Sequence, residues 1–386
     1  MSFRQSLAIS VLAGAVAMGE VLAGAQAPAA QSGQGRSTAA SQTTPAAPAG
    51  RAAAPAGQAA PAGQAAPAGQ GRAGAGAGGA GGAGGAGGAG GRGGGGGGRA
   101  GGRGAPFTPE PEARDMKSVL FNWTWHMGML RSGNESELIK TLHYEAAGGT
   151  MQVNNAPCTL TKYRIDANYQ IPGYRTQIEC KRANGQVYKN IEVLSGDFAW
   201  DEDIPGAELV PGKGKATPRP DAWRERVIRL WTSPQGAPKA AIAGAAGLPV
   251  AQSFGQNPAT LLDRQAAAGA KPTTTMEWQG AKAVFTYPIP GLPDVMATVT
   301  LDKTFLPERV VVKDGATTME WVYSNFADWN NPLFKIEALY AGNMIERKNG
   351  TIVRNVNAKV TEIGQVYVVV PVPDSVQAAG PAAKAN

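Results

Sequence analysis

The densest group of chemically active side chains in this sequence is acidic. Asp197, Asp201, Glu202 and Asp203 lie together in the segment GDFAWDEDIP. Carboxylates at this spacing can bind Ca²⁺ or act as an acid–base pair. The segment lacks the central glycine and terminal glutamate of an EF-hand loop. We therefore interpret it as a solvated turn after a strand, with an extracellular hydrolase that uses Asp197–Asp203 as the alternative.

The two histidines of the chain, His126 and His143, indicate no catalytic centre. The sequence has no HxxxH, CxxC or GxSxG motif, so the common signatures of zinc sites and serine hydrolases are missing. A soft-metal site made by His126, Met127 and Met129 is the weaker alternative. The glycine-rich stretch does not end in Gly-Lys-Ser/Thr, so it is not a phosphate loop. We predict no catalytic residue, no metal site and no cofactor.

Cys158 and Cys180 are the only cysteines. If Pro172-Gly173 forms a two-residue turn, Cys180 lies opposite Ile165, and Cys158 falls seven residues further along on the other face. Bridged Cα atoms must lie within ~7 Å, so this register argues against a disulfide. A bulge or bend near Ala156-Pro157 would restore the bridge, and the pairing stays open.

The N-terminus has the three parts of a secretory signal. Arg4 precedes an apolar run, Leu7–Met18, and Ala23-Gly24-Ala25 has the small-x-small form of a cleavage site. The run is shorter than the ~20 residues of a membrane span. We predict a signal peptide over residues 1–25, cleaved near Ala25, and a periplasmic or secreted protein; an uncleaved anchor is the alternative.

Residues 26–106 consist almost entirely of Ala, Gly, Pro, Gln and Arg. Without large apolar side chains such a segment cannot offset its ordering entropy, so we predict a disordered tether. Its six arginines account for six of the seven net positive charges of the chain, which leaves +1 for the rest. A nucleic-acid partner is therefore not expected. The arginines could hold a membrane surface or a cell-wall polymer, or simply keep the tether soluble.

Residues 107–376 form the predicted folded domain, and residues 377–386 a disordered tail. Alternation of polar and apolar residues, clearest in Lys162–Ile171, predicts about ten antiparallel strands. Asp115 can cap a helix that runs to about Arg131. A helical insertion that starts after Asp221 interrupts the strands. This order predicts a mainly β fold: an incomplete antiparallel barrel wrapped on the N-terminal helix, with an inserted helical lid.

Five stretches carry a resemblance to a known family: Ala297–Leu306, Trp321–Phe326 (WVYSNF), Phe334–Ile336, Val353–Val360 and Val370–Asp374. With the element order, they resemble the bacterial outer-membrane lipoprotein-localisation and lipoprotein-carrier superfamily. The resemblance implies a half-barrel around a helix, a helical lid over an apolar cavity, and a non-catalytic protein that holds a lipid or the acyl group of a lipoprotein. The chain is longer than the small carriers, and its lid region is rich in Ala, Gly and Pro.

Aromatic and aliphatic side chains on the predicted inner faces are the candidate ligand-binding residues. They are Trp123, Met127, Tyr163, Ile165, Tyr169, Trp223, Trp231, Met319, Trp321 and Tyr323. The expected partner is a lipid or a lipidated protein. A structural module of the cell envelope, with a core that contains no cavity, is a further alternative.

Overall fold

The computed structural model describes residues 107–110, 112–130, 139–328, 338–363 and 368–382. These residues belong to one compact unit, Gly94–Asn386. The predicted signal peptide and tether lie outside the described residues. Among the described helices, none is both long enough and apolar enough to cross a bilayer.

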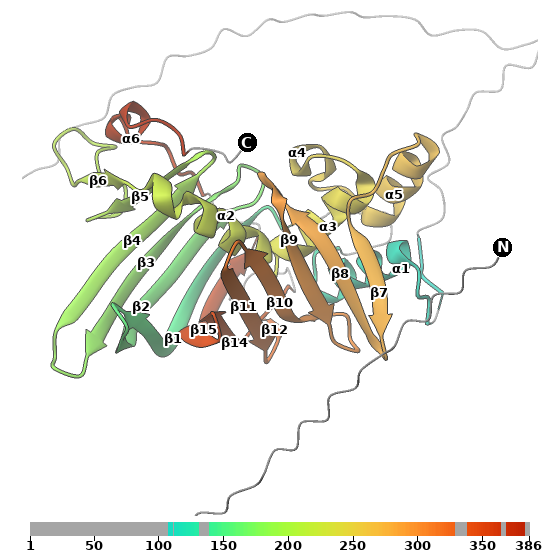
Figure 1. Ribbon diagram of the computed structural model, residues 1–386, viewed down its shortest axis with the longest axis horizontal. Helices are drawn as coiled ribbons and strands as arrows, with labels where there is room; N and C mark the ends of the chain where they lie inside the picture. Colours follow the sequence, from blue (N-terminus) through green and yellow to red (C-terminus); the bar gives the residue numbers. More distant parts are fainter. Residues whose placement is uncertain (1–106, 111, 131–138, 329–337, 364–367, 383–386) are drawn as a thin grey trace, which may run out of the picture. The chain divides into compact units, whose positions relative to one another are not determined.

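A thirteen-stranded antiparallel sheet dominates the unit, in the order β6-β5-β4-β3-β2-β1-β15-β14-β11-β10-β9-β8-β7 (Figure 1). Its strands are β1 Thr141–Val153, β2 Ala156–Asn168, β3 Gly173–Arg182, β4 Val187–Ser195, β5 Phe198–Glu202, β6 Ala216–Pro218, β7 Thr275–Gln279, β8 Lys282–Ile289, β9 Leu292–Leu301, β10 Pro307–Asp314, β11 Thr317–Ser324, β14 Asn343–Lys348 and β15 Thr351–Ile363. A separate pair joins β12 Ala327–Asp328 to β13 Leu339–Tyr340.

The sheet is not closed into a barrel, because β6 and β7 are its two edges. Pairing of β1 with β15 joins the first meander, β1–β6, to the second, β7–β15. The fold is thus mainly β with an incomplete barrel, as the strand pattern predicts. The strand number is larger than the expected ten, partly because the supposed acidic turn contains the short strand β5, and β6 pairs with it.

Among the described residues, one helix precedes the first meander, a helical segment from η1 to α5 separates the two meanders in sequence, and one short helix follows the second. They are α1 Met116–His126, the 3₁₀ turn η1 Pro220–Ala222, α2 Trp223–Thr232, α3 Gly236–Ala246, α4 Val250–Ser253, α5 Pro258–Ala267 and α6 Asp374–Ala378. Asp115 caps α1 as predicted, accepting from the Ser118 main-chain nitrogen at 3.0 Å. The helix ends at His126, before the expected Arg131, and Gly128 follows with φ 71°.

The inserted helices α2 and α3 are largely buried and belong to the core. Every residue of α3 is buried, and α3 packs against α1, α2, α4, α5 and β8. Its small side chains permit this close packing: a Cβ atom on Gly244 would lie 2.3 Å from Thr274 Oγ1. The small Ala and Gly side chains of α3 therefore allow it to pack closely against its neighbours. Helix α1 is one of these neighbours, and it shares the interior of the half-barrel with α3.

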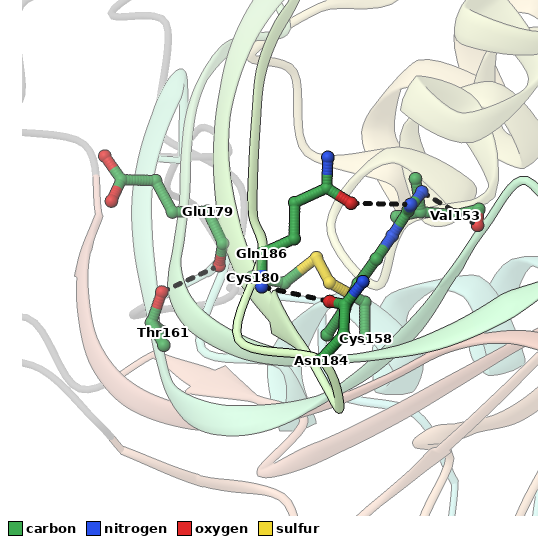
Figure 2. Close-up of a disulfide and its surroundings, with 8 residues drawn as sticks. Val153, Cys158, Thr161, Glu179, Cys180, Asn184 and Gln186 are labelled. Carbon is green, nitrogen blue, oxygen red and sulfur yellow. Dashed lines mark hydrogen bonds between the residues drawn. A yellow bond between two sulfur atoms is a disulfide. The ribbon is translucent and has the colours of Figure 1, made fainter.

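Cys158 and Cys180 form a disulfide, with Cα atoms 5.5 Å apart, so the register that argued against it is wrong (Figure 2). The connection between β2 and β3 is longer than a two-residue turn, because Asn168 pairs with Gly173. A bulge between Leu160 and Lys162 then changes the parity of β2. Cys180 therefore pairs with Leu160, and Cys158 lies diagonally across from it on the same face.

The C-terminal segment is ordered further than the predicted boundary at residue 376. Val368, Val370 and Val376 are buried in a second apolar cluster with residues that include Val193 and Trp200. Helix α6 continues to Ala378, and the main-chain nitrogen of Ala382 donates to Asp197 O at 2.9 Å. These contacts hold residues 377–382, which the polar and small composition of the tail did not indicate.

Candidate functional site

A cavity of about 60 Å³ lies between the inner face of the sheet and helix α2; we call it the inner cavity. Its position follows from strand register, because Ile165 pairs with Thr176 and Tyr323 with Met344, so these side chains point to the same side. Its lining is mainly aromatic and aliphatic. The residues are Leu142, Tyr163, Ile165, Ala167, Tyr169, Tyr174, Thr176, Arg229, Leu230, Ser233, Trp321, Tyr323, Tyr340, Met344, Glu346, Arg354 and Val356.

Tyrosine hydroxyl groups hold the C-terminal end of α2 over this cavity. Tyr323 donates to Thr232 O at 2.8 Å, and Tyr287 donates to Trp231 O at 3.0 Å. The Tyr169 hydroxyl oxygen lies 3.0 Å from Ser233 Oγ. The last carbonyls of a helix have no partners within it. Tyr323 and Tyr287 supply partners for two of these carbonyls, and Tyr169 adds a contact with the Ser233 side chain; we call these three residues the tyrosine clasp.

The N-terminal half of α2 is fastened to both meanders. Arg226 donates to Val193 O at 2.9 Å and to Trp200 O at 2.7 Å, on β4 and β5. Arg224 pairs with Asp314 at 2.7 Å, at the end of β10. Helix α2 thus bridges the two halves of the sheet, and its position fixes the roof of the inner cavity.

Six charged side chains form an ion cluster beside the cavity: Glu192, Glu225, Arg229, Glu346, Lys348 and Arg354. Arg229, on α2, lies 3.2 Å from Glu192, 2.8 Å from Glu225 and 3.1 Å from Glu346. Arg354, on β15, lies 2.9 Å from Glu192. Helix α2 and three strands of the sheet therefore meet in one network with equal numbers of basic and acidic groups, of which Glu225 and Lys348 are the more exposed.

The arginines of this cluster lower the pKa of Glu192 and of Glu225. Burial acts to raise the pKa of Glu192, but Arg354, Arg229 and Arg226 outweigh it and hold that pKa at about 2. Burial raises the pKa of the neighbouring Tyr174 to about 12, and it also raises the pKa of Tyr163. Tyr163 and Tyr174 in the cavity wall are consequently protonated at physiological pH, whereas Glu192 is ionised.

A second, polar cavity of about 310 Å³ lies on the other side of the ion cluster; we call it the outer cleft. Arg229, Glu346 and Arg354 line both the inner cavity and the outer cleft. The remaining walls of the cleft include Asn154, Tyr188 and Lys348. An apolar chamber and a polar chamber therefore adjoin, with charged side chains between them.

Three buried donors at this junction have no hydrogen-bond acceptor among the described residues: Thr176 Oγ1, Arg229 Nε and Arg354 Nη1. A buried polar group without a partner costs about 1–3 kcal/mol. Such atoms are uncommon in folded proteins, and here three of them belong to residues that line the same cavity.

The structure gives the acidic segment a structural role. Glu202 pairs with Arg175 at 2.9 Å and accepts from Trp200 Nε1 at 3.0 Å. Asp201 pairs with Arg219 at 2.8 Å and with Arg226. Asp203 accepts from the main-chain nitrogen of Lys215 at 2.7 Å, on the short connection to β6. These ion pairs and hydrogen bonds hold β5 and its turn against α2.

The side chains of the alternative soft-metal site do not lie together. His126 is exposed, whereas Met127 and Met129 are buried. His143 is buried and lies 2.7 Å from Asp166 through Nδ1. Sequence reasoning missed this pair because it is formed by register partners on β1 and β2. Within the described part of the chain, no three His, Cys, Asp or Glu side chains gather closely enough to hold a metal ion.

The ten predicted ligand-binding residues divide into two equal sets. Those that line the inner cavity are Tyr163, Ile165, Tyr169, Trp321 and Tyr323. Those that are buried in the core away from its lining are Trp123, Met127, Trp223, Trp231 and Met319. Sequence reasoning missed the polar lining residues Thr176, Arg229 and Arg354. Polar side chains on otherwise apolar faces, as at Thr176 between Tyr174 and Ile178, were the available signal.

Comparison with known proteins finds a structural similarity without a sequence match. No family model matches the sequence, and no curated protein matches it. Among solved structures, it is similar to a domain described as an outer membrane lipoprotein-sorting protein from Vibrio parahaemolyticus. The alignment covers 64% of this chain and 93% of that domain, at 10% identity and a TM-score of 0.33. The similarity is one of overall fold, and it carries no residue-level argument.

Proposed function

We propose that this protein is an exported, non-catalytic carrier or receptor that holds the acyl chain of a lipid or lipidated protein in the inner cavity. The observation that supports the proposal is the pairing of an apolar chamber with a polar cleft across α2. An amphiphile is likewise divided into an apolar chain and a polar head group. Burial of the chain is favourable by about 25 cal/mol of free energy for each Å² of apolar surface removed from water, while the head group keeps polar contacts.

The inner cavity must widen before it holds such a ligand. Its volume, about 60 Å³, is well below the roughly 300–1,000 Å³ of ligand sites. Besides its apolar packing in the core, α2 contacts the sheet through hydrogen bonds and ion pairs, and these polar contacts can be exchanged for ligand contacts. We therefore expect α2 to move away from the sheet when an acyl chain binds.

The Cys158–Cys180 disulfide supports a location outside the cytoplasm, because such bonds persist in oxidising compartments. This agrees with the predicted signal peptide. In this arrangement the basic tether, residues 26–106, gives the domain reach, and its arginines hold a membrane surface or cell-wall polymer.

The proposal is tested by purifying the exported protein, identifying co-purified lipid by mass spectrometry, and titrating acyl ligands while recording tryptophan fluorescence. Ala167→Leu adds volume to the wall of the inner cavity, and we expect at least a tenfold loss of affinity. Ala266→Leu, at an exposed position of α5, is the matched control and should bind as the unaltered protein does.

A protein that neither co-purifies with lipid nor responds to any acyl ligand would contradict the proposal and favour a structural envelope module. Equal binding by Ala167→Leu and Ala266→Leu would place the ligand elsewhere in the fold.

A further inference from the structure

The three unpartnered donors described above belong to residues that line one cavity. Thr176 and Glu192 are register partners on β3 and β4, so their side chains are neighbours on the same face. Glu192 in turn accepts from Arg354 at 2.9 Å and from Arg229 at 3.2 Å. All three donor residues line the inner cavity, and both arginines also line the outer cleft. The donors therefore stand where a ligand would pass from apolar to polar surroundings.

These donors are buried and have no hydrogen-bond acceptor among the described residues. The side chains of Arg354 and Arg229 are 9% and 12% exposed, and Thr176 is 0% exposed. The nearest carboxylate to Arg354 Nη1 is Glu346, at 3.6 Å, which is beyond hydrogen-bond distance. Because the described residues offer no acceptor, an oxygen atom of a ligand placed here would gain hydrogen bonds at sites already desolvated.

The charge balance of the ion cluster indicates which oxygen-containing group of a ligand would bind beside the three donors. Glu192, Glu225 and Glu346 already balance Arg229, Lys348 and Arg354. A carboxylate or phosphate would add an unbalanced negative charge to a buried place, which is costly. A carbonyl oxygen accepts the same hydrogen bonds and leaves the balance unchanged.

We infer that Thr176, Arg229 and Arg354 form a carbonyl-binding subsite, which selects acyl esters or amides over free fatty acids. The inference rests on the proposed function and names its ligand class. In this arrangement the ester or amide group lies between the donors, the hydrocarbon chain extends into the inner cavity, and the head group occupies the outer cleft.

The experiment compares three medium-chain ligands of equal chain length: a monoacylglycerol, the corresponding glycerol monoether, which lacks the carbonyl group, and the free fatty acid at neutral pH. Isothermal titration calorimetry measures the affinity of each below its micelle concentration. We expect the ester to bind about tenfold tighter than the ether, the gain of about one or two hydrogen bonds, and tighter than the acid.

Thr176→Val isolates the subsite with a side chain of nearly the same shape. We expect it to weaken ester binding about fivefold, to leave ether binding unchanged, and to raise the unfolding midpoint of the empty protein, because it removes an unpaired buried hydroxyl group. Thr286→Val, whose hydroxyl group already bonds to Thr298 at 3.3 Å, is the control and should not alter the ratio of ester to ether affinity.

Equal affinities for ester and ether, tighter binding of the free acid, or an equal loss for both ligands in Thr176→Val would each overturn the subsite while leaving the carrier proposal intact. Failure of all three ligands to bind would instead reject the carrier proposal.

Discussion

The hydroxyl group of Tyr323 donates to the main-chain oxygen of Thr232 at 2.8 Å, which joins strand β11 to the last turn of helix α2. Both residues are buried. The bond satisfies a carbonyl that the helix itself cannot, and it belongs to the tyrosine clasp that holds α2 over the inner cavity. The tyrosine clasp therefore adds to the apolar packing of α2 in holding the roof of the cavity.

Removal of that hydroxyl group should destabilise the domain without loss of fold. Tyr323→Phe leaves the Thr232 carbonyl without its partner, and we expect a loss of about 1–3 kcal/mol in the free energy of unfolding, measured by urea denaturation. Tyr188→Phe, at a half-buried position beside the outer cleft, should change stability by less than about 0.5 kcal/mol. Equal effects of the two substitutions would contradict the role of the clasp.

The disulfide between Cys158 and Cys180 should be a substantial part of the stability. It closes a loop with a sequence separation of 22 residues, for which loop-closure entropy gives about 3 kcal/mol. We expect the double variant Cys158→Ala/Cys180→Ala to lower the urea midpoint, and a reductant to lower the midpoint of the unaltered protein similarly. The double variant provides the control, since a reductant should not affect it. A reductant-insensitive parent protein would refute the expectation.

Stability should fall in acid because of Glu192. Its pKa is about 2 in the folded protein, against an ordinary value of about 4.3 in the unfolded chain. The folded state thus favours the ionised form, so this stabilisation is present above about pH 4.3 and is lost as the pH falls toward 2. The difference corresponds to about 3 kcal/mol.

Glu192→Gln separates this contribution from those of other acids. We expect the variant to be less stable than the unaltered protein at pH 7. The difference between their free energies of unfolding should become smaller between pH 4.5 and 2, as measured by urea unfolding across that range. Glu179→Gln is the control, since its partner Lys189 is exposed and surface pairs contribute little. A difference in the free energy of unfolding that does not depend on pH would contradict the predicted contribution of Glu192 to stability.

The corner between α2 and α3 should tolerate no side chain at Gly236. A Cβ atom there would lie 2.1 Å from Leu230 O and 2.8 Å from Ser233 Oγ, so the corner would have to shift. We expect Gly236→Ala to cost about 1–3 kcal/mol and to weaken acyl-ligand binding, because Ser233 lines the inner cavity. Gly148→Ala, with nothing within 4 Å of the added atom, should be nearly neutral by the same unfolding assay.

Local patterns sufficed for the fold class. Alternation in Lys162–Asn168 and in Met319–Tyr323 predicts the faces that the structure shows, because the period of a strand depends only on its backbone. Asp115 likewise predicts the start of α1, since a cap acts within one turn. The alternation does not hold as far as Ile171, the last residue of the predicted strand. Its side chain is 68% exposed, because the strand ends at Asn168 before reaching it.

The sequence by itself determined a mainly β domain with a capped helix and an inserted helical segment, and it indicated five of the side chains that line the inner cavity. Only the tertiary structure decided which polar groups meet. The Cys158–Cys180 bond depends on a bulge that changes strand parity. The contact of Arg229 with Glu346 spans 117 residues. Such pairs arise from strand order and register, and no local spacing encodes them.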